Sequence, residues 1–201
     1  MNTAQRSEPK PFPANCSSRF ESNRHRALEL FAHKGFGQVS LRELARHLDL
    51  SPGSIYSHCS GKEELLMEFI EEHYLAMLSL FSRRHLRGCP TEALRRIIHG
   101  LATYHAKHPL HFQLAIRDTR SLRNEQRQYI EQLREQLRQQ LESRLRAAGF
   151  NDSSQTGIPT LELFEHLPLW LANYPLNEQQ RSAALVNVLT AALIHTQEFR
   201  A

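Results

Sequence analysis

The sequence predicts an all-α fold, in which a small N-terminal helical module precedes a larger helical domain. Apolar residues recur at spacings of three and four along nearly every segment, and no segment alternates as a strand would. Serine or threonine three residues ahead of glutamate marks several helix starts, and glycine or proline marks several ends. The 201 residues are 40% apolar and 23% charged, which suits one large domain or a compact body with a small appendage.

We expect three parts along the chain. Residues 1–19 hold Pro9, Pro11 and Pro13 and lack an apolar run, so they predict an extended, disordered arm. Residues 20–62 should form a small helical module. Residues 63–201 should form the larger domain, joined to the module by the helix that begins near residue 60.

The first two helices of the module have clear end signals. The first carries an apolar stripe and ends at Lys34 and Gly35, a pair typical of a helix C-terminus. The second should begin at Ser40, which forms a capping box with Glu43, and should end by Asp49.

A very short third helix is predicted from the stretch LSPGSIYSHCSGKEELL. Ser51 should cap a helix over residues 52–58, because proline follows it at the first helical position. Ser60 and Glu63 form another capping box, which predicts a helix over residues 60–81. The short helix therefore follows its predecessor after a tight turn.

Two helices joined by a tight turn, the second of them short, indicate a helix-turn-helix. A recognition helix enters the major groove of DNA by its N-terminal end, where small residues let the backbone approach. Ser51, Gly53 and Ser54 are such residues. Tyr56 and the polar side chains that follow it can bind the DNA backbone beside the groove. The alternative for any one of them is a cap or a surface turn. The residues expected to bind the DNA backbone are Tyr56, His58 and Lys62.

Residues 28–66, LELFAHKGFGQVSLRELARHLDLSPGSIYSHCSGKEELL, strongly resemble the N-terminal domain of TetR/AcrR-type transcriptional regulators. The resemblance lies in the LFAHKGF helix end, the S-x-R-E-L-A helix, the S-x-G-S-I-Y recognition helix and the K-E-E-L start of the next helix. It implies an all-helical homodimer. Residues 20–62 would bind a double-stranded operator, and residues 63–201 would bind a small molecule and hold the dimer together.

The same resemblance implies a role for each matching residue. Pro52 stands where many relatives carry lysine, which removes one charge from the recognition helix, and Cys59 stands where an aromatic residue usually packs. The implied roles are phosphate contacts by Ser40 and Lys62, groove contacts by Ser51, Ser54, Tyr56 and His58, close approach at Gly53, and a phosphate or base-edge contact by Arg42.

The larger domain should contain five further helices. Pro109 breaks the row of helices early, and Gly149 ends the longest one. The predicted segments are a helix from Thr91 to about Lys107, a helix over 109–117, a helix over 123–148, a loop over 150–159, and helices over 160–174 and 177–199.

The last helix is apolar on more than one side, which a monomer surface rarely tolerates. It resembles, with the helix before it, the pair of helices that forms the dimer interface of the family. A helix buried wholly within one subunit is the alternative. The expected interface residues are Leu163, Leu167, Leu185, Val188, Leu189 and Ala192.

Histidines crowd residues 99–111 and suggest a ligand cavity, since such cavities are mostly apolar with a few polar groups. Arg117 and His105 could accept an anionic effector, unless Arg117 pairs with Asp118. His105 and His108 also have a spacing that can hold a metal, so metal sensing stays open as an alternative. The expected effector-binding residues are Tyr104, His105, Phe112 and Arg117, with Trp170 on the facing side.

The remaining features narrow the function class. The net charge of +4 gathers at the front, where residues 1–62 carry nine Lys/Arg and five Asp/Glu, whereas residues 63–82 carry five acids and no base. No E-x-x-H, GxSxG, HExxH or P-loop pattern supports an enzyme, and the three cysteines lack zinc spacing. A helical adaptor without DNA would leave residues 28–66 unexplained. We expect a cytoplasmic, effector-released repressor without cofactor, metal or membrane segment.

Overall fold

The computed structural model describes residues 14–56, 61–82, 88–150 and 153–193, and all regular structure within these ranges is helical. The all-α prediction is therefore confirmed. The elements are α1 (Ala14–Lys34), η1 (Phe36–Gln38), α2 (Leu41–His47), α3 (Pro52–Tyr56), α4 (Lys62–Ser79), α5 (Pro90–Lys107), α6 (Pro109–Asp118), η2 (Thr119–Ser121), α7 (Asn124–Ala147), α8 (Ser153–Ala172) and α9 (Glu178–Leu193).

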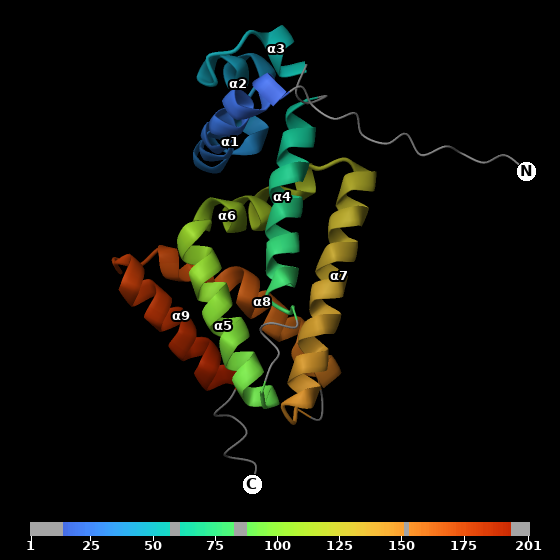
Figure 1. Ribbon diagram of the computed structural model, residues 1–201, viewed down its shortest axis with the longest axis vertical. Helices are drawn as coiled ribbons and strands as arrows, with labels where there is room; N and C mark the ends of the chain where they lie inside the picture. The colour runs from blue at the N-terminus through green and yellow to red at the C-terminus, as the bar shows by residue number, and fades with distance from the viewer. Residues whose placement is uncertain (1–13, 57–60, 83–87, 151–152, 194–201) are drawn as a thin grey trace, which may run out of the picture.

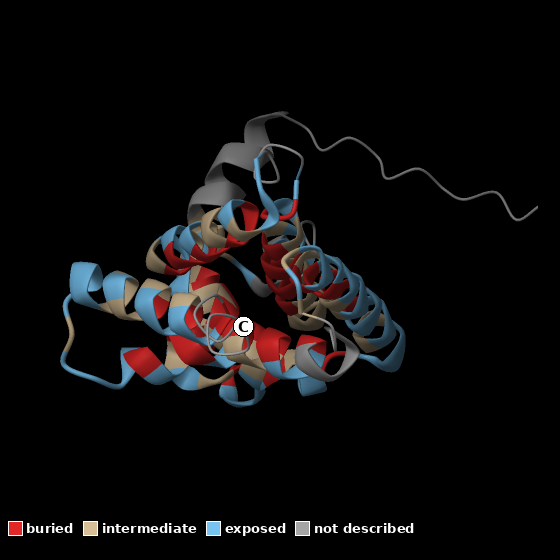
Figure 2. Cartoon of the chain, turned by 90° about the horizontal axis from the view of Figure 1, so that it is seen from below, coloured by how far each residue is buried: buried red, intermediate tan, exposed pale blue. Residues whose placement is uncertain are grey.

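The helices form a small module and a larger domain that share one long helix. Figure 1 shows α1, α2 and α3 gathered at one end, with α4 running from there into the larger domain beside α7. Within that domain α7 packs against α8, and α5 packs against α9. Viewed from below in Figure 2, buried residues gather on the inward faces of the helices and exposed residues on the outer faces.

Aromatic residues join the module to α4. The ring of Phe31, fully buried on α1, meets Phe36 at 5.2 Å and Phe69 of α4 at 6.4 Å between centroids, both edge-to-face. Leu44 of α2 and Ile55 of α3 are buried in the same core. The start of α4 is thus part of the module, while its later turns pack against α6 and α7.

The helix α7 confirms the clearest periodic prediction. Its expected bounds, 123–148, differ from the observed ones by one residue at each end. Every residue of its apolar stripe is buried, because α4 and α8 cover that face. These residues are Ile130, Leu133, Leu137, Leu141 and Leu145.

Two predictions at the front of the chain need correction, and a third lies partly outside the described residues. Helix α1 begins at Ala14, so residues 14–19 are helical, and residues 1–13 lie outside the described part. Helix α3 is described as far as Tyr56, and the rest of its predicted range and the predicted cap Ser60 lie outside the described part. Gly61 occupies the N-cap of α4 and makes no side-chain cap, and the helix ends at Ser79.

The predicted loop over 150–159 was wrong, because α8 already begins at Ser153. Proline and glycine favoured a loop, yet α8 contains both Pro159 and Pro168. Gly157 has a packing reason: a Cβ there would lie 2.3 Å from Glu142 of α7, so only glycine allows this close approach. Helix α5 also starts earlier than predicted, with Pro90 as its first residue rather than behind a Thr91 cap.

A buried polar network ties α4 to the rest of the larger domain. The Tyr74 hydroxyl on α4 donates to Glu165 Oε1 at 3.1 Å, and Arg134 Nη2 of α7 binds Glu165 Oε2 at 2.7 Å. Glu165 is fully buried on α8, and burial together with this carboxylate raises the pKa of Tyr74. Since each polar group is paired, the network fixes the relative positions of three helices.

Candidate nucleic-acid interface and effector pockets

The turn between α2 and α3 is a Schellman motif. Leu50 N–H donates to Ala45 O at 2.9 Å, and Asp49 N–H donates to Arg46 O at 3.2 Å. Asp49 adopts φ 55°, a left-handed conformation that glycine usually supplies at this position. The two bonds satisfy carbonyls at the end of α2 and turn the chain sharply toward α3, as the helix-turn-helix prediction requires.

Two side chains of α1 hold this turn in place. Asn23 Nδ2 donates to Leu48 O at 3.2 Å, and the Arg26 guanidinium donates to His47 O. Arg26 also pairs with the exposed Asp49 carboxylate at 2.9 Å. Helix α1 therefore supplies donors for the last carbonyls of α2, and it fixes the direction in which α3 leaves.

Only half of the predicted capping box at Ser40 forms. Glu43 N–H donates to Ser40 Oγ at 3.2 Å, so the serine caps α2 as predicted. The Glu43 carboxylate does not return the contact but pairs with Lys34 of α1, which lowers the pKa of that carboxyl. The Ser40 hydroxyl keeps its own proton available as a donor toward solvent.

The exposed side of α3 carries small residues and one large ring. Ser51 and Gly53 are exposed, and the nearest atom to a Cβ added at Gly53 would be Ser51 Oγ at 3.8 Å. The packing of the subunit itself therefore does not require glycine at position 53. The side chain of Tyr56 is 61% exposed, and Arg42 at the start of α2 is exposed as well. The side chain of Ser54 and all of His58 lie outside what the structure describes.

Lys62, which we expect to contact a DNA phosphate, also has partners within its own subunit. Its ammonium donates to Phe36 O at 3.1 Å and to Val39 O at 2.7 Å, and it lies 4.2 Å from the centroid of the Phe36 ring. An ammonium has three N–H donors, so one remains. Lys62 therefore holds the segment between α1 and α2 against the start of α4.

Three of the five expected effector residues do come together. The rings of Tyr104 and Phe112 lie 5.4 Å apart, and those of His105 and Phe112 lie 5.0 Å apart. All surround a residue that the sequence did not single out, the fully buried His73 of α4. Its ring lies 4.5 Å from Phe112, and its Nδ1 lies 3.4 Å from the Tyr104 hydroxyl.

The other two expected effector residues lie elsewhere. Arg117 donates to Ala32 O at 2.9 Å and to Phe31 O at 2.7 Å, at the C-terminal end of α1, and it also binds Asp118. Its donors are therefore committed to another helix rather than to a cavity. Trp170 is 53% exposed and stacks edge-on against Tyr174 at 4.7 Å. Neither belongs to the cluster around Phe112.

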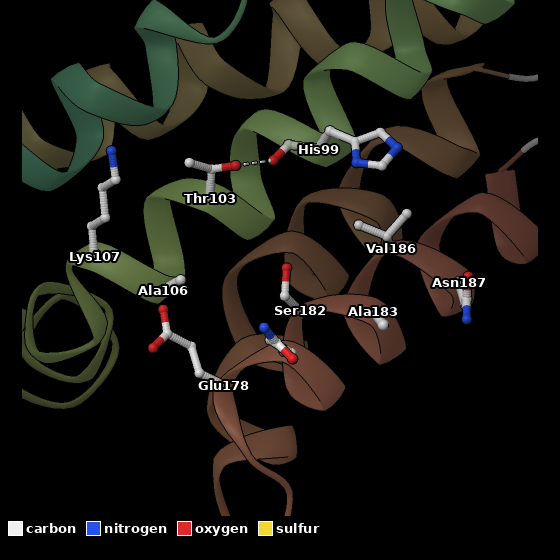
Figure 3. Close-up of a pocket in the computed structure, with 10 residues that line it drawn as sticks. His99, Thr103, Ala106, Lys107, Glu178, Ser182, Ala183, Val186 and Asn187 are labelled. Carbon is white, nitrogen blue, oxygen red and sulfur yellow. Dashed lines mark hydrogen bonds between the residues drawn. The ribbon is translucent and has the colours of Figure 1, made fainter.

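Two hollows border the cluster, and an open groove adjoins one of them. An open groove of about 710 Å³ lies between α5 and α9, with Thr103, Ser182 and Val186 among its lining (Figure 3). A small pocket of about 140 Å³, lined by His105 and Arg181, shares several residues with that groove. A pocket of about 400 Å³ lies among α1, α4 and the junction of α5 and α6. Its lining is Arg24, His25, Leu28, Phe69, Glu72, Ala76, Tyr104, His108 and His111.

The alternative of a histidine metal site finds no support among the described residues. Within the described ranges, the only group of three potential ligands that meets at one point is Glu162, Glu165 and His166. That group excludes His105 and His108, and Arg134 already pairs with both of its carboxylates. The described residues therefore offer no set of three ligands that includes His105 and His108.

Exposed apolar side chains concentrate on the last two helices. Of the seven large exposed apolar residues in the described part, four lie on or next to α8 and α9: Ile158, Trp170, Tyr174 and Val188. Among the expected interface residues, Val188 and Ala192 are exposed, and Leu163 is half-buried. Leu167, Leu185 and Leu189, which we also expect near the interface, are buried in the core of their own subunit.

Acid should destabilise the fold through the two buried histidines. Burial lowers the pKa of His73 to about 3 and that of His105 to about 4. In mild acid the unfolded chain therefore binds protons at these histidines, whereas the folded chain does not. This stability is complete above the unfolded pKa of about 6.5 and falls as the pH drops below it, by about 2 kcal/mol for each histidine at pH 5. Melting temperatures at pH 7 and pH 5 should differ less in His73→Gln than in the parent. An equal difference would contradict this account.

Comparison with known proteins relates this geometry to a family. The chain matches the description "Bacterial regulatory proteins, tetR family" over residues 25–69 and "Tetracyclin repressor-like, C-terminal domain" over residues 87–157. An uncharacterised helix-turn-helix transcriptional regulator of Haemophilus influenzae is 37% identical over 59 residues, which is 29% of either chain. The regulator YuxN of Bacillus subtilis is 38% identical over 48 residues, 24% of this chain and 16% of YuxN. The chain thus spans less than a third of the length of these relatives.

Solved structures share the fold over nearly the whole chain. PfmR of Thermus thermophilus superposes with a TM-score of 0.75 and 24% identity, over 85% of this chain and 96% of PfmR. AibR, solved with isovaleryl coenzyme A and operator DNA, superposes with a TM-score of 0.70 and 17% identity, over 85% of this chain and 97% of AibR. No helix in the described ranges is long and apolar enough to span a bilayer. Together the two family matches cover more than half of the chain, and they show that it belongs to the tetR family of bacterial regulatory proteins.

Proposed function

We propose that the protein is a homodimeric repressor that binds a palindromic operator and is released by a small organic effector. The observation that carries the proposal is the open N-terminal end of α3, where Gly53 has no packing partner that requires it. A backbone so exposed at a helix N-terminus fits close approach to DNA. AibR, which shares the fold, was solved with both a coenzyme A ester and operator DNA.

The DNA contacts follow from the exposed groups of the module. We assign base or groove contacts to α3 and phosphate contacts to the residues around it. The Ser40 hydroxyl has a free proton for a phosphate, and Lys62 has one remaining N–H donor. The proposed contact set is Ser40, Arg42, Ser51, Gly53, Ser54, Tyr56, His58 and Lys62, within a DNA-binding domain of residues 20–62.

The dimer should form through α8 and α9, within a regulatory and dimerisation domain of residues 63–201. The exposed side chains of Trp170, Tyr174 and Val188 give these helices the apolar surface that an interface core needs. In a two-fold dimer the same patch meets itself. We expect Ala192 and Leu163 at the edges of this contact, and Leu185 and Leu189 as the layer beneath it.

We expect the effector to release the operator by shifting the population between two arrangements of the dimer. DNA requires the two recognition helices to lie roughly 34–36 Å apart, and a ligand that prefers another spacing lowers DNA affinity by its differential affinity for the two states. We place the effector near Tyr104, His105 and Phe112, whose contacts reach His73 on α4. The protein would act in the cytoplasm, without catalysing a reaction.

Operator binding can be tested on palindromic DNA from around the gene that encodes the protein. Binding should weaken steeply as salt rises, because phosphate contacts release counterions. Tyr56→Ala should lower operator affinity about tenfold while leaving helicity unchanged, since the ring is exposed and outside the core. Tyr129→Ala, which removes another exposed tyrosine from α7, is the matched control. Equal affinities of the two variants would remove Tyr56 from the interface.

A further inference from the structure

The small pocket beside the groove between α5 and α9, which we call the closed end of the groove, is bordered by two side chains with buried nitrogens that lack hydrogen-bond partners in the described structure. His105 is only 4% exposed, and its Nε2 makes no hydrogen bond within the described structure. The Nε of Arg181 on α9 is buried in the same way. Buried polar nitrogens normally have partners, so this pair points to an acceptor that arrives from outside the chain.

The two groups lie close to each other and line one pocket. Both border the hollow of about 140 Å³, together with the Ser182 hydroxyl. Burial is the main cause that lowers the pKa of His105, and the charge of Arg181 is the second. The guanidinium of Arg181 therefore lies near the imidazole of His105. One guanidinium nitrogen of Arg181 donates to Leu176 O at 3.0 Å, so the end of the α8–α9 connection fixes its position.

The size and charge of the site restrict the ligand. A hollow of 140 Å³ equals about five liquid waters, which suits a carboxylate but not a bulky headgroup. The adjoining groove of about 710 Å³ shares Ala106 and Ser182 with the closed end and continues along Ala183 and Val186 (Figure 3). In Figure 3 the Ser182 hydroxyl points from α9 toward α5, into this space. The groove therefore offers polar groups at one end and an apolar strip beyond it.

The balance of charge also favours an anion. The lining of the two hollows holds Arg181 and Lys107 as cations and Glu178 as the one carboxylate, with the histidines counted as neutral. Glu178 is exposed, so solvent screens its repulsion, whereas the Arg181 Nε is buried. An entering carboxylate would gain charge-assisted hydrogen bonds in a site that is already partly desolvated.

We propose that the groove between α5 and α9 binds an amphipathic organic acid. Its carboxylate accepts hydrogen bonds from Arg181 and His105 at the closed end, and its apolar body lies along Ala106, Ala183 and Val186. The regulatory role of this ligand rests on the proposed function, because α9 also carries the proposed dimer surface. A ligand seated between α5 and α9 would change their spacing and thereby the spacing of the two recognition helices.

The binding site can be tested on the full-length protein without DNA. Isothermal titration with butanoate, octanoate and dodecanoate should show stoichiometric binding of at least one of them, and the alcohol of equal chain length should bind at least about tenfold more weakly. Arg181→Met and His105→Leu should each weaken that binding about tenfold or more. His108→Ala, a histidine outside this groove, is the control and should bind as the parent does.

Several results would overturn the proposal. Failure of all three carboxylates to bind, or equal binding by Arg181→Met and the parent, would do so. Tighter binding of octyl phosphate than of octanoate would overturn the carboxylate assignment. If Arg181→Met does not fold, as its melting curve would show, Ser182→Val tests the same end of the groove, and undiminished binding by that variant would count against the site.

An operator assay separates this inference from the proposed function. A carboxylate that binds through Arg181 but leaves operator affinity unchanged would keep the site and overturn its regulatory role. If the protein bound no palindromic DNA at all, the proposed function would fail, and the titrations would still decide whether the groove binds organic acids. The two proposals therefore stand or fall on different measurements.

Discussion

Replacing Gly53 with alanine should weaken operator binding about ten- to hundredfold while leaving the subunit as stable as before, or more so. Within the subunit the new methyl group would meet nothing closer than 3.8 Å, so it creates no clash. Alanine in a helix is favoured over glycine by up to about 1 kcal/mol. On DNA the same methyl group would hold the backbone of α3 away from the groove, and the lost base contacts are worth about 1–3 kcal/mol each.

The matched control is Gly37→Ala, in η1 of the same module. A Cβ at Gly37 also meets nothing within 4 Å, but this glycine is not on the recognition helix. Thermal unfolding and operator titration of both variants separate a stability effect from a binding effect. Parallel losses of affinity in the two variants would mean that Gly53 has no special place at the DNA.

Replacing Val188 with glutamate should convert the proposed dimer to monomer and abolish operator binding at concentrations where the parent binds. Val188 is 41% exposed in the subunit, so the variant subunit should still fold. In the dimer, two-fold symmetry would bury two unpaired carboxylates, each at a cost of about 3–5 kcal/mol. A monomer reads only one half-site, so operator affinity should fall at least about hundredfold. Sedimentation and operator titration measure the two effects.

Two further variants define the surface. Leu75→Glu adds the same charge at an exposed leucine of α4, and it should remain dimeric. Leu189→Glu places the charge in the core of the subunit, so it should unfold the chain rather than release intact monomers. A dimeric Val188→Glu that binds the operator normally would move the interface away from α9.

Much of the fold could be predicted from the sequence because its signals are local. The period of Ile130, Leu133 and Leu137 defined α7 to within one residue at each end, and Ser40 capped α2 as expected. The start of α8 could not be predicted in this way. A glycine such as Gly157 normally indicates a loop. Its place in a helix is explained only by the side chain of Glu142, which lies against it from fifteen positions earlier in the chain.

The sites were less predictable because their partners are distant in sequence. Arg117 was expected to bind an anion, yet it binds backbone carbonyls 85 and 86 positions away, and carbonyls leave no pattern in a sequence. Arg181 lies beside His105, in the place that we expected Arg117 to take. No pattern in the sequence links Arg181 to His105. On the apolar helix α9, periodicity could not tell the buried Leu189 from the exposed Val188, because the two are neighbours on the same apolar side of the helix.

The contacts of α6 with α1 have a consequence for building chimeric regulators from this protein. Gln113 donates to Ala32 O at 3.0 Å, and Arg117 donates to Ala32 O and Phe31 O, so the larger domain completes the end of a helix in the N-terminal module. A module cut out and fused to another regulator would leave those carbonyls bare unless the recipient supplied equivalent donors. The N-terminal module of this chain therefore cannot simply be exchanged between regulators. A working hybrid would have to carry α6 together with α1, α2 and α3.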